Sequence, residues 1–310
     1  MSLDLRHAIR VLAKNPGVTS LVIFTLALAI GATTAIFSVV YGVLLRPLPY
    51  PQADRLVAVW EVNHRGTFSR LADPNFDDFR DRNRTLSGMA KFTAYTVSVS
   101  GASEPTRSVI APVTKDFFSV MAVAPSLGRG FAPDELRVGA QPAVIVSHRY
   151  WTKYLGGSGE LSSFTLRLEN RAYAVVGVMP AGFDFPAKVD LWVPAELDAE
   201  NRSRTSHNFR SVGRLREGVS VAQASADISA IAKEIVRRSD EQGDYLMTDA
   251  AAVALQTSLT GQVGSTLYVL LGAVFFLLLV ACANVTNLLL SQAAARAREL
   301  AIRHALGAGR

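Results

Sequence analysis

Two long runs of apolar residues dominate the pattern along the chain. No charged residue occurs from Val18 to Leu45 or from Val263 to Ala295. A helix needs roughly 20 apolar residues to cross the hydrocarbon core of a bilayer, and both runs exceed that length. A buried helix of a soluble protein is the alternative interpretation, but two uncharged runs of this length favour membrane spans.

These runs divide the chain into five predicted segments. The segments are residues 1–17, 18–45, 46–262, 263–292 and 293–310. We expect transmembrane helices in the second and fourth, on either side of a large domain. A basic stretch precedes the first run, as in a signal sequence, but the run is longer than a typical signal core and no A-x-A cleavage site follows it. We therefore interpret the first run as a retained span.

Basic residues lie before the first predicted span and after the second. These residues are Arg6, Arg10 and Lys14 before the first span, and Arg296, Arg298, Arg303 and Arg310 after the second. Cytoplasmic flanks of membrane helices carry an excess of Lys and Arg. We expect both termini in the cytoplasm and residues 46–262 outside the cell membrane, which is the periplasm in a Gram-negative bacterium.

The first segment has a pattern of its own. Leu5, Ile9 and Leu12 share one face of a helix, with basic residues beside them, and Pro16-Gly17 separates them from the span. This pattern predicts an amphipathic helix at residues 1–17 that lies on the inner membrane surface and binds anionic lipid. A charged flank that only sets the topology is the alternative.

Small and polar residues interrupt both spans. Gly31 and Thr34 belong to a small-residue patch in the first span, and small residues let membrane helices approach closely. Asn284 and Asn287 share one face near the cytoplasmic end of the second span, where amides facing lipid would be costly. We expect all four residues to pack against other helices, with a role for the asparagines in a substrate path as the alternative.

The middle segment alternates short strand patterns with two helix patterns. Asp73-Pro74 predicts a helix start, with Asp73 as its cap, that runs to Arg82. The capping box Ser220-x-x-Gln223 predicts a helix to about Arg238. Strands are predicted in RLVAVWEV and at residues 93–99, 108–113, 143–147, 164–168, 172–178, 191–194 and 209–215, with a hairpin turn at residues 169–171. Strands and helices without regular βαβ alternation indicate an α+β domain.

Composition adds two limits to this picture. The 310-residue chain has a net charge of +6 but a single cysteine, Cys282, so no intrachain disulfide can form. A middle segment of about 200 residues is large enough for a core without one. In a soluble chain a basic balance suggests nucleic acid as a partner, but here several of the basic residues flank the spans, and we expect no nucleic-acid partner.

Candidate chemistry is sparse. The chain has no G-x-S-x-G elbow and no H-E-x-x-H motif, and its five histidines lack metal-ligand spacing. Ser147 and His148 are neighbours at the end of a predicted strand, where adjacent side chains point to opposite faces. The glycine-rich stretch at residues 156–159 lacks the lysine of a phosphate loop. We predict no catalytic, metal-binding or cofactor-binding residue, and no enzyme activity.

The middle segment resembles the periplasmic core domain of MacB-type ABC transporter permeases. The stretches that carry the resemblance include LLRPLPYPQADRLV, VTKDFFSVMAVAPSLGRGF, AVIVSHRYWTKYLGG and YAVVGVMPAGFDFP. The second span and its tail are similar to the opening of an FtsX-like permease domain. The exit LLRPLPYP resembles in particular an acidobacterial-type group of orphan permeases with a duplicated permease unit.

The resemblance implies a role for the tail. In the family, a cytoplasmic helix after the second span contacts the ATPase subunit, and two further spans follow. Residues 293–310 would then be the start of this coupling segment. Its expected contact residues are Glu299, Leu300, Ile302, Arg303, Ala305, Leu306 and Gly307. A basic stop-transfer flank is the alternative.

The resemblance also implies a function and partners. The chain would be a permease subunit, or the N-terminal portion of one, that couples ATP hydrolysis on a partner subunit to a periplasmic conformational change that drives efflux. Expected partners are an ABC ATPase subunit, a second permease copy, the lipid bilayer, and a periplasmic adaptor or outer-membrane channel. The alternatives are a lipoprotein-releasing or FtsX-type mechanotransmission permease, a two-span sensor with a ligand-binding external domain, and a membrane-anchored enzyme.

Overall fold

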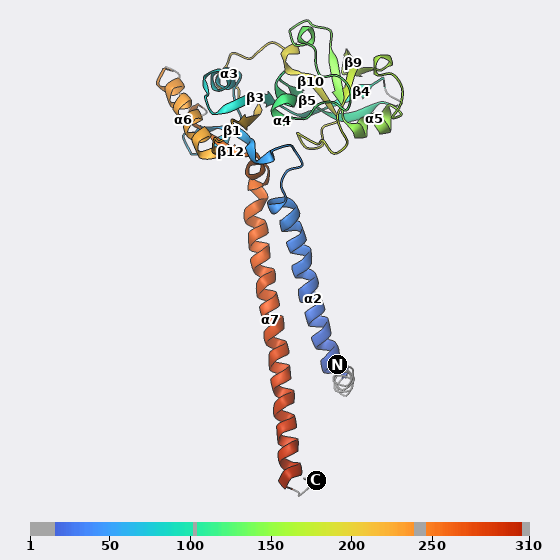
Figure 1. Ribbon diagram of the computed structural model, residues 1–310, viewed down its shortest axis with the longest axis vertical. Helices are drawn as coiled ribbons and strands as arrows, with labels where there is room; N and C mark the ends of the chain where they lie inside the picture. Colours follow the sequence, from blue (N-terminus) through green and yellow to red (C-terminus); the bar gives the residue numbers. More distant parts are fainter. Residues whose placement is uncertain (1–15, 102–103, 239–245, 306–310) are drawn as a thin grey trace. The chain divides into compact units, whose positions relative to one another are not determined.

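The computed structural model describes residues 16–101, 104–238 and 246–305 (Figure 1). The chain forms two compact units. The helix unit contains the residues up to Arg46 and from Thr260 onward, and the domain unit contains Pro47–Leu259. The predicted surface helix at residues 1–17 lies outside the described residues except for its last two.

The helix unit contains both predicted spans. Helix α2 comprises Pro16–Val40 and continues as a π-helical turn at Tyr41–Leu45. Helix α7 is a single helix, Leu255–Ala305. Thr19–Leu45 and Val263–Asn287 are long and apolar enough to cross a membrane, with mean hydropathies of 2.2 and 2.6. Helix α7 begins before residue 263 and continues past residue 292 without a break, so the predicted tail is not a separate element in the described residues.

The first half of the domain unit, called the sheet half, is a four-stranded antiparallel sheet with two helices. Its elements are β1 (Leu56–Asn63), α3 (Asp73–Arg82), β3 (Leu86–Phe92), β11 (Arg210–Leu215), α6 (Val221–Arg238) and β12 (Met247–Ala254). The strand order is β3-β11-β1-β12. The sheet half contains two strand-helix-strand units, β1-α3-β3 and β11-α6-β12. Strand β11 lies between β1 and β3, and β1 lies between β11 and β12, which is the arrangement of a ferredoxin-like split βαβ fold.

Strand β1 shows why the sheet forms. Successive side chains of a strand point to opposite faces. Val57 and Val59 belong to a buried cluster with Phe76 of α3 and residues of α6. Leu56 and Ala58 belong to a second cluster on the other face. Because both faces are covered, the strand is apolar at nearly every position rather than alternating.

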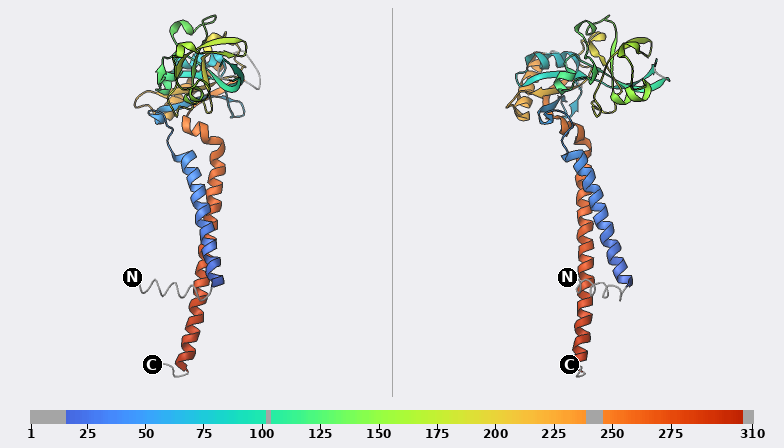
Figure 2. Two further views of the ribbon diagram at one scale, coloured as in Figure 1. Left: turned by 90° about the vertical axis from the view of Figure 1, so that its right-hand side faces the viewer. Right: turned by 45° about the vertical axis from the view of Figure 1, so that its right-hand side comes forward.

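The second half, called the barrel half, is inserted between β3 and β11. Its strands are β4 (Tyr95–Ser100), β5 (Thr106–Val113), β7 (Ala143–Val146), β8 (Thr165–Leu168), β9 (Arg171–Val178) and β10 (Leu191–Pro194). They pair in the order β10-β7-β9-β8-β4-β5, and β10 also pairs with β5. This last pairing closes the strands into a ring, and closure removes the open edges. Figure 2 shows the two halves as neighbouring bodies.

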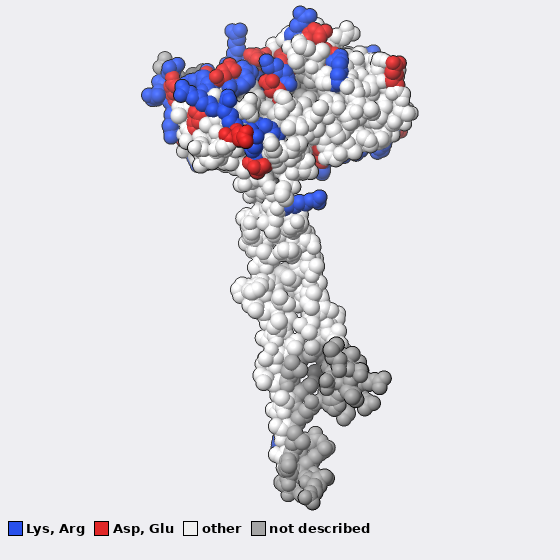
Figure 3. All heavy atoms as spheres, in the orientation of Figure 1, with Lys and Arg blue, Asp and Glu red and all other residues white. Residues whose placement is uncertain are grey.

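Shorter elements complete the domain unit. They are β2 (Phe68–Ser69), which pairs with β1, β6 (Leu127–Gly128), which pairs with β9, and helices α4 (Phe117–Met121) and α5 (His148–Tyr154). On the face seen in Figure 3, charged side chains gather over the sheet half around α3 and α6, while the barrel half is mostly uncharged.

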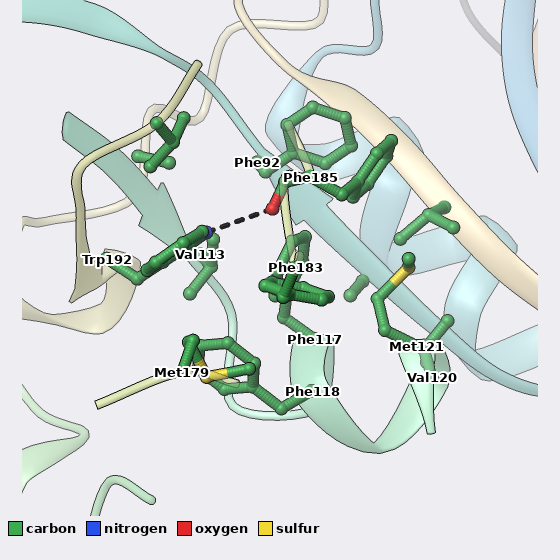
Figure 4. Close-up of a cluster of buried hydrophobic side chains, with 14 of the residues drawn as sticks. Phe92, Val113, Phe117, Phe118, Val120, Met121, Met179, Phe183, Phe185 and Trp192 are labelled. Atoms are coloured by element: carbon green, nitrogen blue, oxygen red, sulfur yellow. Dashed lines mark hydrogen bonds between the residues drawn. The ribbon is translucent and has the colours of Figure 1, made fainter. Parts of the chain in front are cut away.

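An aromatic core joins the two halves (Figure 4). The ring of Phe185 lies 5.1 Å from that of Phe92 on β3 and 5.9 Å from that of Phe117 on α4. Trp192 of β10 is fully buried, and its Nε1 donates a hydrogen bond of 3.1 Å to the carbonyl of Phe185. These large rings bury much apolar surface and fix the barrel half against the sheet half.

Most predicted elements of the domain are confirmed. The predicted strands correspond to β1, β4, β5, β7, β8, β9, β10 and β11 within a few residues, and the predicted helices to α3 and α6. The capping box is present, since Gln223 N donates to Ser220 Oγ at 3.2 Å and Ser220 N donates to Gln223 Oε1 at 2.8 Å. The hairpin turn is confirmed at Glu169, where φ is 53°. Strands β3 and β12 and helices α4 and α5 are missed.

Two local predictions are wrong. Asp73 does not cap α3, because Ala72 holds the cap position and Asp73 is already helical. The Asp73 carboxylate is used elsewhere: it accepts from Lys91 Nζ at 2.6 Å and from Asn201 N at 2.8 Å. Ser147 and His148 do not share a strand either, because β7 ends at Val146. Ser147 caps α5 by accepting from the backbone N–H of Tyr150 at 3.1 Å.

The Asp73–Lys91 ion pair is the most buried one in the described chain. The two side chains are 5% and 6% exposed. Lys91 Nζ also lies 5.0 Å from the ring centroid of Phe76 and 5.2 Å from that of Phe209. The pair joins α3, which carries Asp73, to β3, which carries Lys91. Asp73 also accepts from Asn201 N and so holds the segment that leads from the barrel half back to β11.

We expect Asp73→Ala to lower the free energy of unfolding by about 3 kcal/mol, because it leaves the Lys91 ammonium buried without its counter-charge. Urea unfolding of the detergent-solubilised chain, followed by tryptophan fluorescence, measures the change. Asp81→Ala is the control: Asp81 is 62% exposed in its pair with Arg80, and its loss should cost less than about 1 kcal/mol. Equal effects of the two substitutions would contradict the assignment.

Candidate functional site

The chain passes between the helix unit and the domain unit at two points, and both are held by the sheet half. The first is the incoming segment, Pro47–Arg55, which precedes β1. The second is the passage from β12 into α7. The contacts that hold these two points, called the junction, lie within the domain unit and are the candidate site.

Arg214 of β11 holds the incoming segment. Its side chain is almost fully buried, at 7% exposure. The guanidinium donates to the backbone carbonyls of Val120 at 2.7 Å, Pro51 at 3.2 Å and Gln52 at 3.4 Å. Burial, and to a lesser degree the nearby Arg55, lowers the pKa of Arg214. Since a buried charge is costly unless its hydrogen bonds are satisfied, these carbonyls replace the water that the guanidinium has lost.

Arg55 fixes the same segment from its other end. Its Nε and one terminal nitrogen donate to the carbonyl of Leu215 at 3.0 and 2.7 Å. The other terminal nitrogen donates to Gln52 Oε1 at 3.0 Å. Gln52 has a left-handed backbone with φ of 49°, which is uncommon for a residue other than glycine. The turn at Gln52 is therefore held through its side chain by Arg55 and through its carbonyl by Arg214.

Tyr50 extends the incoming segment to the barrel half. Its ring lies 5.8 Å from Phe183 and 6.1 Å from Phe185, both edge-on. Its hydroxyl donates to the carbonyl of Asp184 at 3.3 Å, and burial raises its pKa to about 12. The segment thus contacts both halves of the domain within a few residues.

The outgoing connection has no loop. Strand β12 pairs with β1 along its whole length, up to Ala254 opposite Val57, and α7 begins at the next residue. Leu255 is 2% exposed within the core. Trp60 Nε1 of β1 donates to Ser258 Oγ in the first turn of α7 at 3.1 Å. Strand and helix are therefore one continuous stretch of regular structure.

The helix unit brings some of the predicted packing residues together. Asn284 and Asn287 of α7 line a groove of about 410 Å³ with Thr25 of α2. Gly31 is exposed, and a Cβ added to it would meet no atom within 4 Å. Thr34 is also exposed, and its hydroxyl donates to the carbonyl of Ile30 in its own helix at 2.8 Å. Packing of Gly31 and Thr34 against a further helix stays a prediction.

The predicted ATPase contact lies at the end of α7. Its residues Glu299, Leu300, Ile302, Arg303 and Ala305 belong to the last turns of the helix, and Ile302 is 53% exposed. Leu306 and Gly307 lie outside the described residues. The role of this stretch stays a prediction.

The junction residues were missed from the sequence. One signal was available: in the predicted strand at residues 209–215, Arg214 shares a face with the apolar Val212. The described residues contain no group of three or more His, Cys, Asp or Glu that could hold a metal ion.

Comparisons with known proteins agree with this architecture. The family model of the MacB-like periplasmic core domain matches residues 19–231. The macrolide export ATP-binding/permease protein MacB of Burkholderia thailandensis is 26% identical over 204 residues, which are 65% of this chain and 30% of that protein. The chain thus matches less than a third of the length of this relative.

A solved structure shows the same fold. The periplasmic region of MacB from Actinobacillus actinomycetemcomitans superposes with a TM-score of 0.50 at 10% identity, over 68% of this chain and 94% of that one. The family match covers more than half of the residues, and the two apolar helices flank an α+β domain of the matching type. The chain therefore belongs to the family of the MacB-like periplasmic core domain.

Proposed function

We propose that this chain is a permease subunit of an ABC transporter, or the N-terminal portion of one. In this proposal it couples ATP hydrolysis on a partner subunit to a conformational change of its external domain that drives efflux. The family match supports the transporter class. The observation that carries the mechanism is the junction, which joins both apolar helices to neighbouring strands of one sheet.

The junction is suited to transmit force. The incoming segment is tied to β11 by Arg55 and Arg214, and α7 extends β12 directly. A relative displacement of the two connections would be applied across β11, β1 and β12, which are adjacent strands. Interfaces and packed cores switch between discrete arrangements rather than deforming continuously, so a small displacement at this point can change the contact between the two halves.

The same proposal assigns the remaining parts. The chain lies in the inner membrane with both termini in the cytoplasm, as the basic flanks indicate. It binds an ABC ATPase subunit through the end of α7 and pairs with a second permease copy. The external domain acts on the exported substrate together with an adaptor or an outer-membrane channel. Macrolide export is the activity named for the Burkholderia relative, and a macrolide is the first substrate to test.

We expect Arg214→Gln to release the incoming segment. Loss of hydrogen bonds to a charged group is worth about 1.5–3 kcal/mol, so amide exchange at residues 50–55 should accelerate about tenfold or more. Hydrogen–deuterium exchange measures this, with the amide of Arg55 as reporter because it donates to the Gln52 carbonyl. Arg216→Gln, an exposed change two residues after Arg214 in the chain, is the control. Unchanged protection in Arg214→Gln would show that Arg214 does not hold the segment.

We expect the end of α7 to retain the ATPase. The complex is extracted from native membranes in a gentle detergent, and its stoichiometric companions are identified by mass. Arg303→Glu combined with Leu306→Asp reverses a charge and replaces an apolar residue by a charged one, and should lower the retained ATPase about tenfold or more. Arg298→Gln changes one charge on the same helix and should leave retention unchanged. A folded wild-type chain without any ATPase companion would overturn the transporter proposal.

A further inference from the structure

Two arginines of the sheet half face each other across an antiparallel bridge. Leu71 and Phe209 form the bridge, with backbone hydrogen bonds of 2.7 and 3.1 Å in the two directions. Arg70 precedes Leu71 and Arg210 follows Phe209, so the two arginines occupy the next pair of opposing positions. That pair is not hydrogen-bonded, and side chains in such pairs are especially close. Like charges placed directly opposite destabilise a sheet.

Neither arginine has a counter-charge of its own. Both arginines are exposed to solvent. In the described chain neither guanidinium takes part in an ion pair or a hydrogen bond, while the backbone carbonyl of Arg70 lies 3.1 Å from His207 Nδ1. Burial, followed by the charge of Arg70, lowers the pKa of Arg210. The carboxylate of Glu61 at this end of β1 is fully buried and already used: it accepts from Ala72 N at 2.9 Å and lies 3.0 Å from His207 Nδ1.

An aromatic pair lies on the same face of the sheet. Leu71 points toward α3 and α6 with the buried cluster, so Arg70 points to the opposite face, and Phe68 shares that face by the alternation of the strand. The rings of Phe68 and Trp60 stack at 6.2 Å with an interplanar angle of 23°. Phe68 is 52% exposed.

The chain connects this face to the apolar helix. Trp60 donates its hydrogen bond to Ser258 in the first turn of α7. On the same helix the apolar stretch that can cross a membrane begins at Val263. Trp60 is thus bonded to the turn that precedes the span, and tryptophans are enriched where a membrane protein meets the interface between lipid and water.

We propose that Arg70 and Arg210 bind the phosphate of an anionic phospholipid headgroup, with Trp60 and Phe68 placed beside it in the lipid interface. Guanidinium groups match phosphate oxygens through paired hydrogen bonds. A phosphate between the two side chains replaces their repulsion with two attractions. Anionic lipids also attract basic residues near the membrane surface. This site is separate from the ATPase contact, so its test does not depend on the transporter proposal.

The test uses native mass spectrometry of the full chain in detergent. Wild type, Arg70→Gln/Arg210→Gln and a control are each mixed with equal amounts of phosphatidylglycerol and phosphatidylcholine. The control is Arg107→Gln/Arg167→Gln, which removes the same charge from two exposed arginines of the barrel half. We expect wild type and control to retain phosphatidylglycerol about fivefold or more over phosphatidylcholine at one site. The Arg70/Arg210 variant should lose that site. Inorganic phosphate is added in a parallel series as a competitor.

Each outcome decides the proposal. Loss of the selective site in the Arg70/Arg210 variant alone, with little competition by inorganic phosphate, supports it. Equal selectivity in that variant and the control overturns it. Binding of inorganic phosphate to wild type without lipid selectivity also overturns it and assigns the pair to a soluble phosphate. A melting temperature measured without anionic lipid excludes misfolding, because removal of two like charges should leave it equal or higher.

Discussion

The pairing of β1 with β12 is the contact on which the rest of the domain depends. The first strand after the incoming segment pairs with the last strand before α7 from Val57 opposite Ala254 to Asn63 opposite Met247. The two ends of a domain of more than 200 residues are thereby side by side. Such a pairing must overcome the loop entropy of everything between the strands, and both faces of β1 are buried in return. Without this ladder the two connections would have no common support.

The insertion of the barrel half follows from the same arrangement. Because β1, β11 and β12 hold the connections, the barrel can leave the sheet after β3 and return at β11, and it touches the incoming segment at Tyr50. Its attachment is then made by side chains: the aromatic core around Phe185 and Trp192, and the Asp73–Lys91 pair beside Asn201. A buried ion pair contributes little net stability compared with an apolar substitute. Its place at the returning segment suits a role in fixing the orientation of the two halves.

The sequence predicted the elements whose cause is local. The two spans, the alternating strands and the capping box of α6 each carry their signal within a few residues. Strand β12 has the sequence MTDAAAVA, in which alanine has a weak preference for strands, and it is a strand because β1 lies beside it. Strand β3 contains Lys91, which looks exposed until Asp73 is placed next to it. The junction was out of reach for the same reason: the carbonyl partners of Arg214 lie 94 to 163 residues away in the sequence.

The arginines of this domain discussed above form two groups, one that holds the fold together and one that we propose binds a ligand. Arg214 and Arg55 are satisfied by backbone carbonyls, so their charges are complete within the fold, and they bind the chain to itself. Arg70 and Arg210 are brought together by an equally well-formed bridge, yet the fold supplies no acceptor for either. Two facing cations at the surface repel each other, and an anion bound between them replaces that repulsion with attraction. The same sheet therefore uses arginine in two ways: at one end to secure the incoming segment, and at the other to leave a site for a ligand.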